Sequence, residues 1–261
     1  MAWEFVRNGM LGKITEVKVG LPAGGGGGGQ GPLQPQEIPQ GFDYEMWLGP
    51  APWAPYYKER CHWNFRWIFD YSGGQLTDWI GHHFDVASWA LGVSETGPAE
   101  IREASAQFPD GPLYNTAQKY AFEAHYANGT VIKVASRDDD NGGFRGGIVF
   151  KGTEGSIWVD RGGIEFDPIG LRYAPIPSNG QRLDRIEHLQ DFVNCVRSRQ
   201  KVICPVHEAQ RTASVAHLAN ACFRSGRSGL KWDPVQEKVL DAPDAEKFLS
   251  RAYRSPWQLP V

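Results

Sequence analysis

The sequence contains no long hydrophobic run, few cysteines and no excess of either charge. No apolar stretch approaches the roughly 20 residues that a membrane-spanning helix needs. With 27 basic and 30 acidic residues the net charge is −3, which provides no broad electrostatic surface for nucleic acid or an anionic membrane. The first residues lack the basic-then-apolar order of a signal peptide, so we expect neither a membrane nor a nucleic acid as partner.

Four cysteines are scattered through the 261 residues without any C-x-x-C pair. This spacing favours neither a disulfide framework nor a zinc knuckle. Hydrophobic side chains make up 41% of the sequence and charged ones 22%, enough to bury a substantial core. We therefore expect a globular, cytoplasmic protein with reduced cysteines.

Glycine and proline are abundant, with 31 and 18 residues. Residues 21–42 are rich in Gly, Pro and Gln, include the run Gly24–Gly29, and show no periodicity; they predict a flexible surface loop. A glycine run after a strand is also found in phosphate-binding loops, but those lead directly into a helix N-terminus. Because Gln30 and the prolines beyond it are unsuited to start a helix, we expect no nucleotide site here.

The hydrophobic periodicity predicts an α+β fold: an open, mostly antiparallel β-sheet with helices packed on one face. Strands are expected at residues 14–19, 99–108, 118–126, 130–136, 147–151, 156–160, 164–167 and 171–176. Helices are expected at 1–12, 43–48 (capped by Asp43), 72–91, 183–199, 207–225 and 244–251.

The helix expected at 72–91 carries an unusual polar stripe. Its apolar stripe, which should face the core, consists of Ile80, Phe84, Ala87 and Leu91. On the opposite face lie Asp78, His82, Asp85 and Trp89, at i, i+4, i+7 and i+11. A carboxylate one turn from an imidazole can orient it for acid/base chemistry. The alternative is a structural helix with satisfied polar groups. A metal site is less favoured, because this face has no second histidine.

The same segment also contains three glycines and a second histidine. Gly73, Gly74 and Gly81 lower helix propensity and suggest close approach by a ligand or by another backbone. His83 points away from the polar stripe, and we expect a structural role for it.

The pattern G-G-x-L-x-D-x-x-x-H-x-x-D, followed by Trp-Ala-Leu-Gly, resembles the substrate-domain signature of the glucose–fructose oxidoreductase / inositol dehydrogenase / MocA (Gfo/Idh/MocA) family. Segments 47–53, 64–74, 152–155, 188–198 and 251–257 resemble its sugar-dehydrogenase branch. The resemblance implies that His82 transfers the proton of a sugar hydroxyl with help from Asp78.

The same resemblance implies a division into domains. The family's catalytic lysine and its glycine-rich NAD(P) fingerprint belong to an N-terminal Rossmann domain, and neither is found in this sequence. Residues 1–12 are then expected to be a remnant of the last helix of that domain, and residues 13–261 the α+β substrate domain. We expect this chain to bind no NAD(P) and no metal of its own.

The substrate, a small sugar or glycoside, is expected to contact residues that come mostly from these motifs: Trp63, Arg66, Tyr71, Asp85, Arg137 and His188. For the aromatic residues the alternative is core packing. Arg66 can be anchored by Asp70 and still present donors to hydroxyl groups. In relatives the open sheet face packs against another subunit, so a homo-oligomer is expected as well.

Three functional hypotheses remain open at this stage. In the first, the chain is a sugar-binding domain that needs a separately supplied nucleotide domain. In the second, it is an NAD-independent glycoside hydrolase or lyase that acts on glycosides or 3-keto sugars through Asp78 and His82. In the third, it is a non-catalytic sugar-binding or interaction protein.

Overall fold

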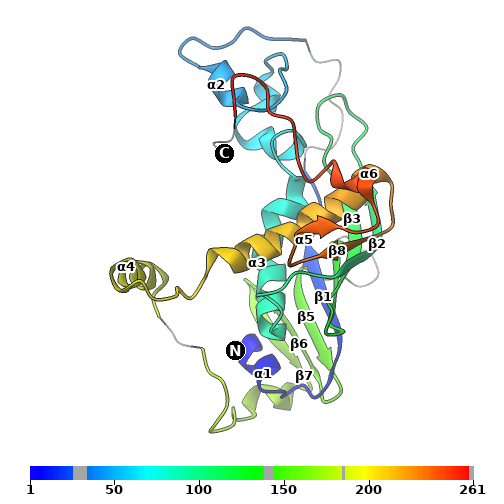
Figure 1. The fold of residues 1–261 in the computed structure, drawn as a ribbon. Coiled ribbons are helices and arrows are strands. Elements are labelled where there is room, and N and C mark those ends of the chain that lie inside the picture. The colour runs from blue at the N-terminus through cyan, green and yellow to red at the C-terminus, as the bar shows by residue number, and fades with distance from the viewer. Residues whose placement is uncertain (26–33, 138–143, 184–185, 259–261) are drawn as a thin grey trace.

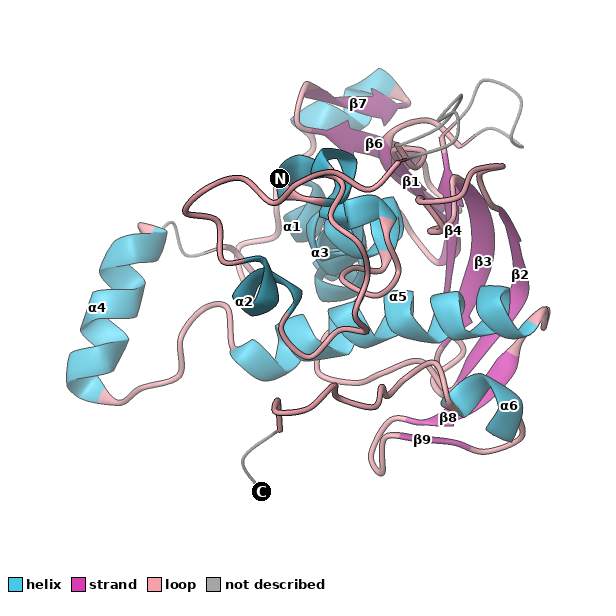
Figure 2. Ribbon diagram, turned by 90° about the horizontal axis from the view of Figure 1, so that it is seen from above, coloured by secondary structure: helices cyan, strands magenta, loops and turns pink. Residues whose placement is uncertain are grey.

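The structure, a computed structural model, describes residues 1–25, 34–137, 144–183 and 186–258. These residues form a nine-stranded sheet with the order β7-β6-β5-β1-β4-β3-β2-β8-β9. Helices α1, α3 and α5 lie on one face of this sheet (Figures 1 and 2). The expected fold class, an open and mostly antiparallel α+β sheet covered by helices on one face, is confirmed.

Neighbouring strands in the sheet are antiparallel except for one pair. The strands are β1 (Ile14–Leu21), β2 (Glu100–Gln107), β3 (Lys119–His125), β4 (Val131–Ser136), β5 (Gly147–Gly152), β6 (Ser156–Asp160), β7 (Gly163–Asp167), β8 (Leu230–Asp233) and β9 (Lys238–Val239). The exception is the pairing of β1 with β4, which is parallel and sets Val19 beside Val134. The strand nearest the N-terminus thus lies in the centre of the sheet.

The prediction of a strand at residues 171–176 is wrong. Residues Ile169–Tyr173 form a 3-10 helix, η3, and no regular structure follows it up to residue 183. Pro168, Pro175 and Pro177 flank this stretch, and proline has no N–H to donate to a strand ladder. The short strands β8 and β9 were not expected.

The helices are α1 (Ala2–Arg7), α2 (Tyr44–Leu48), α3 (Gly74–Leu91), α4 (His188–Ser198), α5 (Val206–Ser225) and α6 (Pro243–Glu246), with 3-10 helices η1 (Lys58–Arg60) and η2 (His62–Trp67). The expected cap of α2 is confirmed, since the Asp43 carboxylate accepts a hydrogen bond from the Met46 N–H at 2.9 Å. The helix expected at 183–199 was too long: α4 begins only after its N-cap, Glu187. The helix expected at 244–251 ends at Glu246.

Helix α3 packs on the sheet through the apolar stripe expected from its sequence. Ile80, Phe84 and Ala87 are at most 1% exposed. Helix α5 crosses α3 and is bonded to it, because the Asn220 amide donates to the carbonyl of Gly73 at 3.0 Å. The polar face of α3 is thereby held in a fixed orientation.

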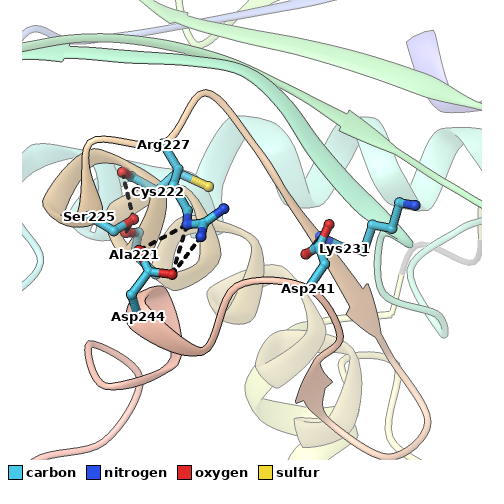
Figure 3. Close-up of polar contacts among 7 residues, drawn as sticks. All are labelled: Ala221, Cys222, Ser225, Arg227, Lys231, Asp241 and Asp244. Carbon is cyan, nitrogen blue, oxygen red and sulfur yellow. Dashed lines mark hydrogen bonds and ion pairs between the residues drawn. The ribbon is translucent and has the colours of Figure 1, made fainter.

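The end of α5 is connected to α6 and β8, as Figure 3 shows. Gly226 ends the helix with a left-handed φ of 69°, and Arg227 donates three hydrogen bonds of 2.6 to 3.0 Å to the Asp244 carboxylate. The N–H of Lys231 donates to Asp241 at 2.8 Å. These contacts attach the C-terminal elements to the edge of the sheet.

In the loop expected at 21–42, no helix follows β1 among the residues that the structure describes. Gly26–Gly29, most of the glycine run, lie outside the described residues. Within the described part of the chain no helix is long and apolar enough to cross a membrane.

Candidate functional site

The polar stripe of α3 lies opposite the buried apolar stripe of the helix. Asp78, His82 and Trp89 are exposed and Asp85 is half-buried. This placement follows from the burial of the opposite, apolar stripe against the core. The helix therefore presents a carboxylate and an imidazole, one turn apart, at the surface of the domain.

Asp78 faces Arg66, which η2 positions beside α3. The Arg66 Nε atom lies 3.7 Å from the Asp78 carboxylate, and its guanidinium lies 4.1 Å from the centre of the Trp63 ring. The anchor of Arg66 is thus Asp78 and not Asp70, which instead faces Arg251 at 3.9 Å. Trp63 is 69% exposed. The cluster of Trp63, Arg66 and Asp78 therefore combines an exposed aromatic ring with a guanidinium group that its neighbours hold in place.

His82 lines a cavity of about 440 Å³ between α3 and strands β5 and β6. Its imidazole lies edge-on to the Trp79 ring, with 5.5 Å between ring centres. Among the described residues it makes no hydrogen bond to Asp78. The imidazole thus contacts the Trp79 ring and, among the described residues, is not held by a hydrogen bond to another side chain.

His83, expected to be structural, is buried and pairs with the half-buried Asp160 at the end of β6. The two side chains are 3.0 Å apart, Nε2 to Oδ1. Since the carboxylate only accepts, Nε2 carries the proton and donates. Burial lowers the pKa of His83 and outweighs the opposing effect of Asp160, so the ring is mostly neutral at pH 7. The pair joins α3 to the sheet at the wall of the cavity that His82 lines.

Asp160 and Arg161 are site residues that the sequence analysis missed. Both line the cavity with His82, and the Arg161 guanidinium lies 4.5 Å from the centre of the Trp79 ring. They are more than 75 positions from His82 in the sequence and follow a strand whose register depends on the whole sheet. No local pattern marks them.

The lowered pKa of His83 predicts that the stability of the fold depends on pH. Unfolding returns the imidazole to its ordinary pKa of about 6.5, so below that pH the unfolded chain binds a proton that the folded chain does not. The free energy of unfolding should therefore fall as the pH falls below about 6.5, and level off beneath the lowered pKa. Urea denaturation between pH 5 and 8 measures this. His83→Gln, which keeps a donor for Asp160, should show a weaker dependence; an equal dependence would contradict the assignment.

A second cavity, of about 540 Å³, adjoins the first along α3, and Gly81, Asp85 and Val86 line both. Asp85 borders both cavities, but its carboxylate accepts a hydrogen bond from the Thr212 hydroxyl at 2.6 Å. Most of the lining is apolar, with Trp3 and Trp89 at 5.2 Å between ring centres. Asp85 therefore connects α3 to α5 at the boundary of the two cavities.

The other expected substrate residues lie apart from this cluster. The Tyr71 hydroxyl accepts from Arg60 at 3.1 Å, and burial raises its pKa. Arg137 is exposed just after β4, and its N–H donates to the carbonyl of Leu21 at 2.7 Å. His188 is the first residue of α4, which projects from the body (Figure 2). The structure thus places Trp63 and Arg66 beside Asp78, one helical turn from His82, but leaves these three elsewhere.

The glycines of α3 provide a matched pair of substitutions. A Cβ at Gly81 would meet nothing within 4 Å, whereas Gly74 has a φ of +80° and its Cβ would lie 2.6 Å from the Thr116 Cβ. Gly81→Ala should therefore raise the free energy of unfolding by about 0.5–1 kcal/mol, and Gly74→Ala should lower it by more than about 1 kcal/mol. Urea denaturation of both variants checks this. Stabilisation by Gly74→Ala would contradict the close approach to Thr116.

A family model described as "Oxidoreductase family, C-terminal alpha/beta domain", from the Gfo/Idh/MocA group, matches residues 3–259. The chain belongs to this family. A comparison with curated proteins finds none that matches.

Solved structures share the fold of this oxidoreductase C-terminal domain. An aldose-aldose oxidoreductase from Caulobacter crescentus, complexed with glycerol, is 15% identical with a TM-score of 0.53; the match covers 88% of this chain and 59% of that one. A levoglucosan dehydrogenase in complex with NADH and L-sorbose is 17% identical (TM-score 0.51), with 88% and 61% covered. An oxidoreductase from Thermotoga maritima is 17% identical (TM-score 0.50), with 88% and 57% covered. The chain thus spans about 60% of the length of these structures.

Proposed function

We propose that this chain is a carbohydrate-binding substrate domain in which His82 exchanges a proton with a sugar hydroxyl. The observation that carries the proposal is the cluster of Trp63, Arg66 and Asp78, one helical turn from an exposed histidine on a cavity wall. Solved relatives of this fold hold L-sorbose or glycerol, which agrees with a polyhydroxyl ligand.

Each residue of the cluster has a distinct task. The exposed indole of Trp63 stacks on the apolar face of a sugar ring. Arg66 donates to ring hydroxyls from a guanidinium that Asp78 and the Trp63 ring hold in place, so little side-chain entropy is lost on binding. The imidazole of His82 then accepts the proton of a hydroxyl group that lies in the cavity.

The proposal assigns no dinucleotide site to the described residues. Such a site needs a glycine turn that leads from a strand directly into a helix N-terminus. Strand β1 ends at Leu21 and leads into Pro22, and the next helix within the described residues is α2, which starts at Tyr44. On this proposal, redox chemistry takes place only together with a nucleotide-binding domain outside these residues, and the chain alone should bind a sugar but not NADH.

Calorimetry with a panel of aldoses, methyl glycosides and NADH tests the proposal. Sugar binding should fall at least about fivefold in Trp63→Ala, given the roughly 1–3 kcal/mol that a buried aromatic contact contributes. Trp53→Ala is the matched control, because Trp53 is 67% exposed and Trp63 is 69% exposed. An equal loss in both variants, or micromolar NADH binding to the chain alone, would refute the proposed function.

A further inference from the structure

Helix α4 stands away from the body of the domain, as Figures 1 and 2 show. It nevertheless carries an apolar stripe at i, i+3, i+4 and i+7: Leu189, Phe192, Val193 and Val196, which are 70, 58, 40 and 49% exposed. A helix that remains in water has polar residues at such positions, whereas a stripe of this kind is typical of a helix packed against another surface.

The opposite face of α4 is occupied by the chain's own return segment. Asp191 is 8% exposed, and its carboxylate accepts the N–H of Ile203 at 3.0 Å. The Cys195 thiol lies 3.6 Å from the carbonyl of Lys201, to which it donates. Because segment 201–203 covers the polar face, it turns the apolar stripe outward and away from the segment itself.

The apolar cavity of about 540 Å³ lies where this arm joins the body. The chain leaves along its edge at Leu183 and returns at Ile203 and Cys204. Trp89 and Val86 form part of its wall and are 39% and 38% exposed. One chain thus carries both an unpaired apolar helix and an open apolar groove, which we call the α3 groove.

We propose that two copies of this chain exchange α4, so that the apolar stripe of each helix fills the α3 groove of the other. The arm and the groove are adjacent, so the exchange forms a two-fold, closed interface. The stripe and the groove residues Val86, Trp89 and Ile203 expose roughly 600 Å² per copy, so a dimer would bury about 1,200 Å², at the lower end of the range of stable interfaces.

Charge complementarity also favours a second copy as the occupant. Arg197 and Arg199 lie at the C-terminal end of α4. The groove contains the carboxylates of Glu208, which lies 3.6 Å from Lys201 of its own chain, and of Asp85, which accepts a hydrogen bond from Thr212. Exchange brings opposite charges together while the apolar surfaces meet. It uses a surface different from the open sheet face expected at first for oligomerisation.

A cysteine cross-link tests the exchange with the full chain. Cys204 is exposed and lines the groove, so Leu189→Cys should form a disulfide to Cys204 of a second copy under mild oxidation, giving a covalent dimer on a non-reducing gel. Peptide mapping identifies the 189–204 bond. The matched control, Leu189→Cys combined with Cys204→Ser, should stay monomeric on that gel. A 189–204 bond within one chain, or a 189–189 bond, would overturn the proposal.

Ultracentrifugation of the unmodified chain provides an independent measurement. Phe192→Glu should raise the dissociation constant of the dimer at least about 100-fold, because it places a charge in the centre of the interface. Val235→Glu is the control, since Val235 is 86% exposed in the turn between β8 and β9. A chain that is monomeric at all concentrations, or a dimer that Phe192→Glu leaves intact, would refute the exchange and assign the stripe to another partner.

Discussion

Replacing His82 by alanine is expected to lower the rate of sugar oxidation by 10²- to 10⁴-fold, the usual contribution of a general acid or base, while the affinity for the sugar changes by less than about threefold. The imidazole is exposed, lines the cavity and holds no other described side chain by a hydrogen bond, so the fold should tolerate its loss. The rate is measured as kcat with the chain fused to the nucleotide-binding domain of a matched dehydrogenase, and the affinity by calorimetry.

The control for this experiment is His207→Ala, which removes another exposed histidine at the start of α5. His207 lies outside the cavity of His82, so the rate should stay within about twofold of the unmodified fusion. If His82→Ala kept the full rate, proton transfer by His82 would be refuted. If it abolished sugar binding instead, the residue would be a binding group and not the acid/base group.

Local sequence signals predicted the elements whose ends are determined locally. The cap at Asp43 located α2, and the apolar stripe through Ile80 and Phe84 located α3 and its buried face. Local signals failed where a longer-range effect decides. Residues 171–176 alternate like a strand, but Pro175 within them and Pro168 and Pro177 beside them leave them outside the ladder. Strand β8 is short, and its pairing with β2 depends on where α5 ends.

The candidate site could be predicted only along α3. Helical spacing alone placed Asp78 and His82 on one face, and family motifs supplied Trp63 and Arg66. The partner of Arg66 was assigned incorrectly as Asp70, because nearness in sequence does not predict which carboxylate a 3-10 helix will face. Asp160 reaches His83 through the register of β6 in the sheet, information that no local pattern contains.

Replacing Phe84 by alanine is expected to lower the free energy of unfolding by about 3–5 kcal/mol, the cost of removing a large buried side chain and leaving a cavity. Phe84 is 0% exposed and lies on the core face of the helix that carries Asp78 and His82. The core and the site therefore depend on the same element. Urea denaturation at one fixed protein concentration measures the change, because dimerisation would make the midpoint depend on concentration.

Val235→Ala is the control, since it shortens a side chain that is 86% exposed in the turn between β8 and β9. The change should stay within about 0.5 kcal/mol, because little buried apolar surface is lost. A loss below about 1.5 kcal/mol in Phe84→Ala would show that α3 is not sealed against the sheet. In that case its polar stripe would not be held in a fixed orientation, and Asp78 and Arg66 would bind sugar no better than two free surface side chains.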